Sequence, residues 1–122
     1  MILLMKELVI PDGECNDMDS TVFDLGAFRK LERLSVGSFS LGSILTVRIR
    51  NLKSLESLVF KEESFTRKNG ELHIENCVAL KTLSILDGSF HFFSALSLKS
   101  LPSLETLEIG ADCFTEVEPF TL

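Results

Sequence analysis

The chain has 122 residues, of which 45% are hydrophobic and 25% are charged, and its formal net charge is -6. This length and balance fit one globular domain and exclude a chain that is disordered throughout. The acidic charge argues against a nucleic-acid partner, because the longest basic run is Arg67-Lys68. No segment has the roughly 18 apolar residues of a membrane span, so we expect no membrane insertion.

The apolar residues predict short strands in chain order. A first strand ends near Ile10 and is followed by an acidic loop and by a second strand around Phe23 and Leu25. The same pair of pieces then returns four times. Each first piece follows the template Φxx-Φxx-Φx-Φ, where Φ is an apolar residue. Its second apolar positions are spaced by 26, 24, 25 and 24 residues and are occupied by Met5, Leu31, Leu55, Leu80 and Leu104.

Each second piece is an alternating apolar pair, and these pairs are Phe23/Leu25, Val47/Ile49, Leu72/Ile74, Leu96/Leu98 and Phe120/Leu122. Ten residues after each second apolar position stands a bulky or apolar residue, namely Cys15, Leu41, Phe65, Phe90 or Phe114. Pieces this short bury their apolar side only by stacking on one another. The repeat therefore predicts two parallel sheets that enclose a continuous core.

The units resemble those of the leucine-rich repeat family, which follow LxxLxLxxNxL over about 20–29 residues. The resemblance covers essentially the whole chain, for example at Leu55/Leu58/Phe60/Phe65 and Leu80/Leu83/Ile85/Phe90. The asparagine position of the family is occupied instead by Phe39, Glu63, Gly88 and Asp112. The Phe-rich units with a second strand look most like the BspA-type or Treponema-like repeats. An unrelated two-sheeted β-solenoid is the alternative.

The predicted fold is a mostly β solenoid, a right-handed leucine-rich-repeat-like superhelix with few or no helices. It has about five repeats of 24–26 residues in a single domain, residues 1–122. The units are approximately 2–27, 28–51, 52–76, 77–100 and an incomplete 101–122.

Residues between the apolar positions of the first sheet should point outward. Small Ser, Thr and Val side chains dominate the centre of this face, and such a flat face could admit a protein surface or a peptide. The same side chains also simply suit an exposed parallel sheet. The predicted partner-binding residues are Arg33, Ser35, Ser57, Val59, Lys61, Thr82, Ser84, Leu86, Thr106 and Glu108. On the second sheet, Arg50, Glu75 and Lys99 alternate in charge, which favours a structural ladder.

Candidate chemistry is weak elsewhere. The acidic loop places oxygen ligands at Asp12, Glu14 and Asn16, but it lacks the glycine and the final glutamate of an EF-hand. Ser89 and Cys113 occupy a small-residue position that the repeat itself requires. We therefore expect no metal, no cofactor and no enzyme activity, although a pocket lined by His91 with Ser89 or Asp87 would favour an enzyme. The three cysteines, Cys15, Cys77 and Cys113, form no CxxC pair, and we expect reduced thiols.

The ends of the chain lack the polar caps of a solenoid. The sequence stops at Leu122 in the middle of a unit, which predicts a fragment of a longer array. Alternatively, the open ends stack on a second copy and give a homo-oligomer, or irregular termini fold over them. The expected function is a non-catalytic protein-interaction or adhesion domain that binds a protein or peptide on the first-sheet face, with self-assembly through the ends as the alternative. The compartment stays open between the cytoplasm and, for a fragment, the cell surface.

Overall fold

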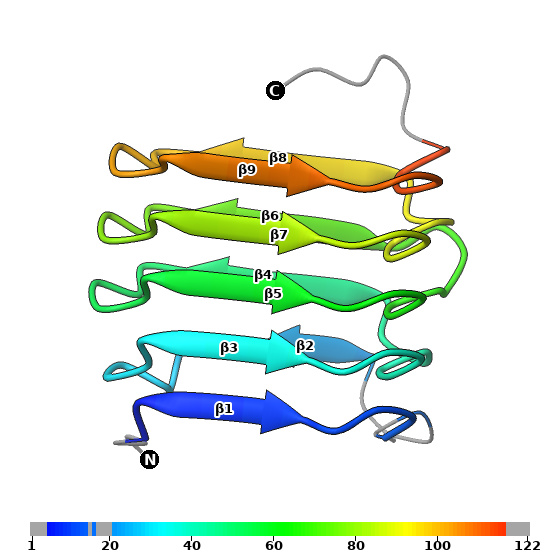
Figure 1. The fold of residues 1–122 in the computed structure, drawn as a ribbon, viewed down its shortest axis with the longest axis horizontal. Helices are drawn as coiled ribbons and strands as arrows, with labels where there is room; N and C mark the ends of the chain where they lie inside the picture. Colours follow the sequence, from blue (N-terminus) through cyan, green and yellow to red (C-terminus); the bar gives the residue numbers. More distant parts are fainter. Residues whose placement is uncertain (1–4, 15, 17–20, 117–122) are drawn as a thin grey trace.

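A computed structural model describes residues 5–14, 16 and 21–116 of the chain. Nine strands and no helix occur in these residues, and the strands form two parallel sheets in a right-handed β-solenoid (Figure 1). The first sheet contains β1 (Glu7–Ile10), β3 (Arg33–Val36), β5 (Ser57–Phe60), β7 (Thr82–Ile85) and β9 (Thr106–Ile109). The second sheet contains β2 (Val22–Asp24), β4 (Thr46–Arg50), β6 (Glu71–Glu75) and β8 (Ala95–Lys99).

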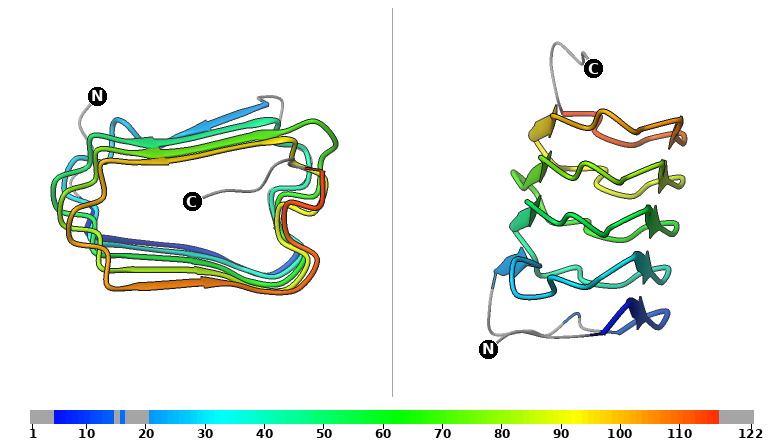
Figure 2. Two further views of the ribbon diagram at one scale, coloured as in Figure 1. Left: turned by 90° about the horizontal axis from the view of Figure 1, so that it is seen from above. Right: turned by 90° about the vertical axis from the view of Figure 1, so that its left-hand side faces the viewer.

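The two sheets face each other across the core, and corners at both ends join them (Figure 2). We call one first-sheet strand, the following second-sheet strand and their corners a rung. The described residues form about four full turns, and β9 begins the next. The predicted number of about five units is therefore slightly high for this part of the chain, and the fifth predicted second-sheet pair, Phe120/Leu122, lies outside the described residues.

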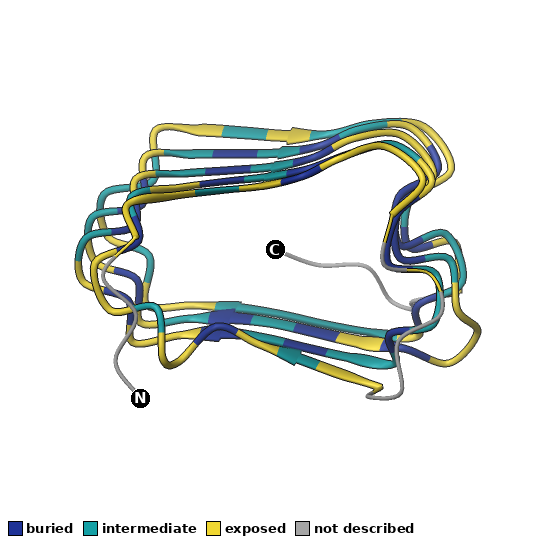
Figure 3. Cartoon of the chain, turned by 90° about the horizontal axis from the view of Figure 1, so that it is seen from below, coloured by how far each residue is buried: buried dark blue, intermediate teal, exposed yellow. Residues whose placement is uncertain are grey.

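The strand register follows the repeat. Leu34, Leu58, Leu83 and Leu107 are direct partners on neighbouring first-sheet strands. On the second sheet, Val47 pairs with Leu72, which pairs with Leu96. These apolar residues point into the space between the sheets. Along each of these strands, buried residues therefore alternate with more exposed ones (Figure 3). Met5 departs from the predicted pattern, because it is 43% exposed although it occupies a core position of the template.

A column of phenylalanine rings fills one end of the core. The Phe65 and Phe90 rings are parallel with centroids 4.7 Å apart, and Phe114 stacks on Phe90 at 5.4 Å. Phe60 and Phe93 meet this column edge-on. All five rings are buried. A phenylalanine at the same position of successive rungs therefore stacks on its own copies, which favours one register over a slipped one.

The corners require a left-handed backbone at three positions of the repeat. The first is occupied by Phe39, Glu63, Gly88 and Asp112, the second by Leu41, Phe65, Phe90 and Phe114, and the third by Asn51, Asn76 and Ser100, all with φ between 53° and 77°. Side chains other than Gly, Asn and Asp rarely adopt this conformation. The corner geometry is thus set by the stacked rungs and not by the local preference of each residue.

A buried polar ladder runs beside the phenylalanine column. The hydroxyl of Ser40 donates to the Pro11 carbonyl, and that of Ser89 donates to the Lys61 carbonyl, one rung earlier in each case. The thiol of Cys113 donates in the same way to the Leu86 carbonyl. The serines at this position are buried and Cys113 is partly buried, so these side chains give hydrogen bonds to carbonyl groups of the corners.

Gly37 follows β3 directly and is buried. A Cβ atom there would collide with the backbone of Pro11 and Asp12 on the preceding rung. Glycine allows the corner of the first rung to approach that of the second.

Candidate interaction surface

The structure brings the ten predicted partner-binding residues together on the outer face of the first sheet. Its first column runs through Arg33, Ser57, Thr82 and Thr106, which are paired in register. Its second column runs through Ser35, Val59, Ser84 and Glu108. Lys61 and Leu86 extend the face, because their backbone amides continue the ladder by bonding to the carbonyls of Val36 and Phe60. We call these ten residues the first-sheet face.

The centre of the first-sheet face has free hydroxyl groups. Ser57, Val59, Thr82 and Ser84 are half-buried by their neighbours on adjacent strands. The hydroxyls of Ser57, Thr82 and Ser84 make no hydrogen bond within the described part of the chain. This centre therefore offers donors and acceptors on a flat surface of small side chains.

Charged residues surround this centre. Arg33, Lys61 and Glu108 are exposed. The Arg33 Nε atom lies 3.5 Å from the Glu7 Oε2 atom, in a pair whose side chains are more than half exposed. Such a surface pair contributes at most about 1 kcal/mol to stability. The low charge of this centre and its polar rim are features that it shares with protein-binding surfaces, whose centres are depleted of charged residues.

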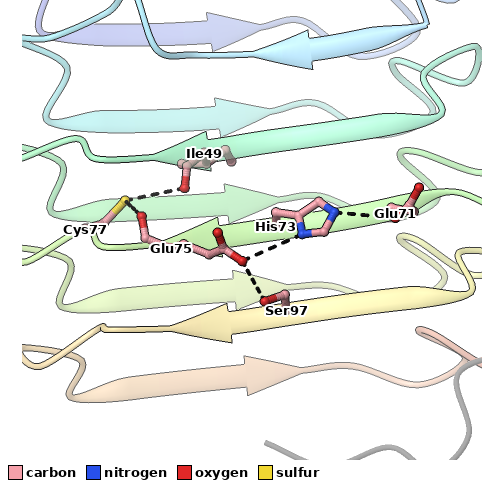
Figure 4. A network of polar contacts seen from close by, with 6 residues as sticks. All are labelled: Ile49, Glu71, His73, Glu75, Cys77 and Ser97. Atoms are coloured by element: carbon pink, nitrogen blue, oxygen red, sulfur yellow. Dashed lines mark hydrogen bonds and ion pairs between the residues drawn. The ribbon is translucent and has the colours of Figure 1, made fainter.

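On the second sheet, four side chains of β6 and β8 form a polar network instead. The Ser97 hydroxyl donates to Glu75 Oε2 at 2.8 Å, and the two nitrogens of His73 lie 3.6 and 3.8 Å from carboxylate oxygens of Glu71 and Glu75 (Figure 4). The hydrogen bond from Ser97 is the main cause that lowers the pKa of Glu75, and it outweighs the opposing effect of partial burial. The polar groups of Ser97 and Glu75 on this face are therefore already bonded to each other.

The predicted charge ladder on the second sheet is only half confirmed. Arg50, Glu75 and Lys99 are indeed paired in register. Neither basic side chain comes within 4 Å of the Glu75 carboxylate, which bonds to Ser97 instead. The Glu75 carboxylate bonds to Ser97 because the serine hydroxyl lies close enough to donate a direct hydrogen bond. The long side chains of Arg50 and Lys99 extend into solvent instead.

Ser89 and Cys113 both belong to the polar ladder beside the phenylalanine column. Ser89 is fully buried, and its hydroxyl bonds to the Lys61 carbonyl and to Ser64. Burial raises the pKa of the Cys113 thiol, so this group is protonated at neutral pH. Burial likewise raises the pKa of the Cys77 thiol. His91 packs against Phe92, with ring centroids 4.3 Å apart.

The acidic loop uses its oxygen atoms to join neighbouring rungs. Asp12 Oδ1 accepts from the Ser38 amide, and Asn16 Oδ1 accepts from the Gly42 amide. Among the described residues no group of three His, Cys, Asp or Glu side chains could hold a metal ion. Cys15, Asp17 and Asp19 of this loop lie outside the described residues.

Sequence reasoning missed a basic hollow at a corner that leads from the second sheet to the first. Its lining consists of Gly26, Arg29, Arg50, Asn51 and Lys53. The available signal was that Arg29 and Lys53 occupy the same repeat position in successive units, two residues before Leu31 and Leu55. That signal is weak, because the following units carry Val78 and Pro102 there.

The chain matches no protein-family model, no curated protein and no solved structure. Within the described residues, no helix is long and apolar enough to span a membrane.

Proposed function

We propose that this chain is a non-catalytic interaction domain that binds a protein segment on the first-sheet face. The observation that carries the proposal is the row of hydroxyls of Ser57, Thr82 and Ser84 at the centre of that face, which have no hydrogen-bond partner among the described residues. The opposite sheet shows the contrast, because there Ser97 is already bonded to Glu75. A contact or adhesion role and a relationship to leucine-rich repeats are part of the same proposal.

The size of the first sheet, of which the first-sheet face occupies four strands, favours a peptide over a large globular surface. Five strands at about 4.8 Å spacing span about 19 Å, and four residues along a strand span about 13 Å. The product, about 250 Å², is well below the roughly 800 Å² that each partner of a standard protein complex buries. An extended peptide of about six residues, at about 3.3 Å per residue, would cross all five strands.

The test is selection of peptides from a displayed random library on the intact chain, followed by titration of the selected peptides against variants. The double variant Val59→Lys/Ser84→Glu places bulk and charge at the centre of the face, and it should weaken binding by at least tenfold. The matched control is Lys99→Glu, an exposed charge on the opposite sheet, and it should leave the affinity unchanged. Equal affinity for the face variant and the wild type, with both folded by circular dichroism, would refute the proposal.

A further inference from the structure

We infer that the basic hollow lined by Gly26, Arg29, Arg50, Asn51 and Lys53 binds a phosphomonoester dianion or inorganic phosphate. The residues that line the hollow belong to the corners where β2 and β4 lead into the next first-sheet strands. These corners lie at the left of Figure 1. Its volume of about 380 Å³ falls within the range of small-molecule sites, about 300–1,000 Å³. This site is separate from the first-sheet face and does not depend on the proposed peptide binding.

The hollow exists because one rung lacks a side chain. Asp24 and Arg48 are paired in register, so Gly26 and Arg50, two residues further on, occupy the same position of successive rungs. Glu75 and Lys99 occupy that position on the following rungs. Only Gly26 leaves the space empty. Arg50 borders it from the next rung, while Arg29 and Lys53 border it from two successive corners.

The cations of the hollow form no direct ion pair with a described carboxylate. Arg29, Arg50 and Lys53 have no carboxylate within 4 Å in the described part of the molecule. This is notable in a chain whose net charge is -6. Glu75 faces Arg50 in the register and attracts it from a distance, but its carboxylate is bonded to Ser97. An unpaired group of cations that shares one hollow is an arrangement that an anion stabilises.

Two further polar groups, the amide of Asn51 and the carboxylate of Asp24, lie beside the cations of the hollow. Asn51 Oδ1 accepts a hydrogen bond from Asn76, which leaves the Nδ2 atom of Asn51 as a donor without a partner among the described residues. Asp24 opposes an anion, but its Oδ1 atom is bonded to the Gly26 amide at 2.9 Å. The donor set therefore consists of two guanidinium groups, one ammonium group and one amide.

This donor set fits a phosphate group better than a carboxylate. A phosphomonoester carries a charge of about -1.5 to -2 at neutral pH and has three acceptor oxygens. Guanidinium groups bind such oxygens in pairs, and a lysine adds a point charge. A single carboxylate has one charge and two oxygens, so it would leave part of the donor set unpaired.

The experiment follows backbone amides of the intact chain by NMR during titration with sodium phosphate, O-phospho-L-serine, sodium sulfate or sodium acetate at constant ionic strength. Saturable shifts are expected at Gly26, Asn51 and Lys53 for both phosphates, with at least fivefold weaker binding of acetate. Tighter binding of O-phosphoserine than of phosphate would identify an esterified phosphate as the ligand, and the reverse would identify the free ion. Shifts that do not saturate, or equal affinity for acetate, would overturn the inference.

Variants separate this site from general attraction to cations. Gly26→Glu should abolish phosphate binding, because it places a carboxylate in the hollow at the position that Glu75 has on a later rung. Arg50→Gln should weaken binding about tenfold, and Asp24→Asn should strengthen it two- to fivefold while retaining an acceptor for the Gly26 amide. Lys68→Gln, a matched control at the other end of the rungs, should have no effect. Unchanged binding by folded Gly26→Glu would also overturn the inference.

Discussion

Phe39 combines two unfavourable features that its repeat position does not require together. Its φ is 57°, and its side chain is 64% exposed. Its backbone is well bonded, since the amide donates to the Glu62 carbonyl and the carbonyl accepts from Asn16. The left-handed conformation costs a residue with a Cβ atom about 1–2 kcal/mol, and an exposed ring recovers little of that by burial.

Replacing Phe39 with asparagine should therefore raise the free energy of unfolding by about 0.5–1 kcal/mol, because asparagine tolerates this conformation. Urea denaturation measures the change. The matched control is Phe90→Asn, which has a similar φ of 56° but a fully buried, stacked ring. The control should lose about 3–5 kcal/mol. A loss of stability in Phe39→Asn would show that the exposed ring makes contacts that exceed its backbone strain.

Individual residues also show what the sequence could not predict. The left-handed conformation of Asn51 and Asn76 agrees with their residue type. Phe65 and Phe90 gave no such signal, since bulky residues disfavour positive φ. Their conformation follows from the rungs above and below, where the ring stack and the corner hydrogen bonds outweigh local preference.

Among the strands, the register was predictable and the side-chain partners were not. The spacing of apolar residues placed Leu34, Leu58 and Leu83 in one column, because a slip by one residue would turn them all outward. Glu75 bonds to Ser97 and not to Arg50 or Lys99. This partner depends on how far each side chain reaches, and the spacing of residues in the sequence does not predict that. The basic hollow depended on the absence of a side chain at Gly26, which is visible only once the rungs are aligned in space.

The pairing of β6 with β8 should make stability depend on pH through Glu75. Its pKa in the folded chain lies below the ordinary value of 4.5, chiefly because of the bond from Ser97. A lowered pKa stabilises the fold above the ordinary value, and this contribution is lost as the pH falls through the folded pKa. The variant Ser97→Ala removes the main cause of the shift. The stability difference between wild type and Ser97→Ala should be present at pH 7 and shrink as the pH falls below 4.5.

Urea denaturation at pH 7 and at several values below 4.5 measures this difference. The control is the same substitution in a Glu75→Gln background, where the cost of Ser97→Ala should not vary with pH, because no carboxylate remains to titrate. A cost that is constant with pH in the wild-type background as well would show that the hydrogen bond does not favour the ionised form of Glu75.

The molecule as a whole is built from contacts between neighbouring rungs. Every strand pair joins strands of adjacent rungs, and the phenylalanine column repeats the same stack from rung to rung. Stability in such an array is close to a sum of terms for single units and for their interfaces. One consequence is that a whole unit can be removed if the two new neighbours match.

Deletion of residues 52–76 removes β5 and β6 and joins Asn51 to Cys77. Asn76 precedes Cys77 before the deletion, and Asn51 precedes it afterwards. These two asparagines are 25 residues apart and bond to each other. Both have a left-handed backbone, so the new corner from Asn51 to Cys77 reproduces the existing corner from Asn76 to Cys77. β3 would then lie beside β7, with Leu34 against Leu83. The shortened chain should keep the circular dichroism of a β protein and unfold cooperatively in urea. Its midpoint and its m-value should both be lower, since less surface is buried.

A deletion of about half a unit, residues 52–63, serves as the control. It removes β5 but keeps β6, so the alternation between the two sheets is broken and the chain should not fold cooperatively. The comparison decides whether the repeat is the unit of folding. If both deletions unfold the chain, interactions between distant rungs hold the solenoid together. If only the half-unit deletion does so, the contacts between neighbouring rungs are sufficient, and the 24–26-residue period is the length at which a chain returns to its own register.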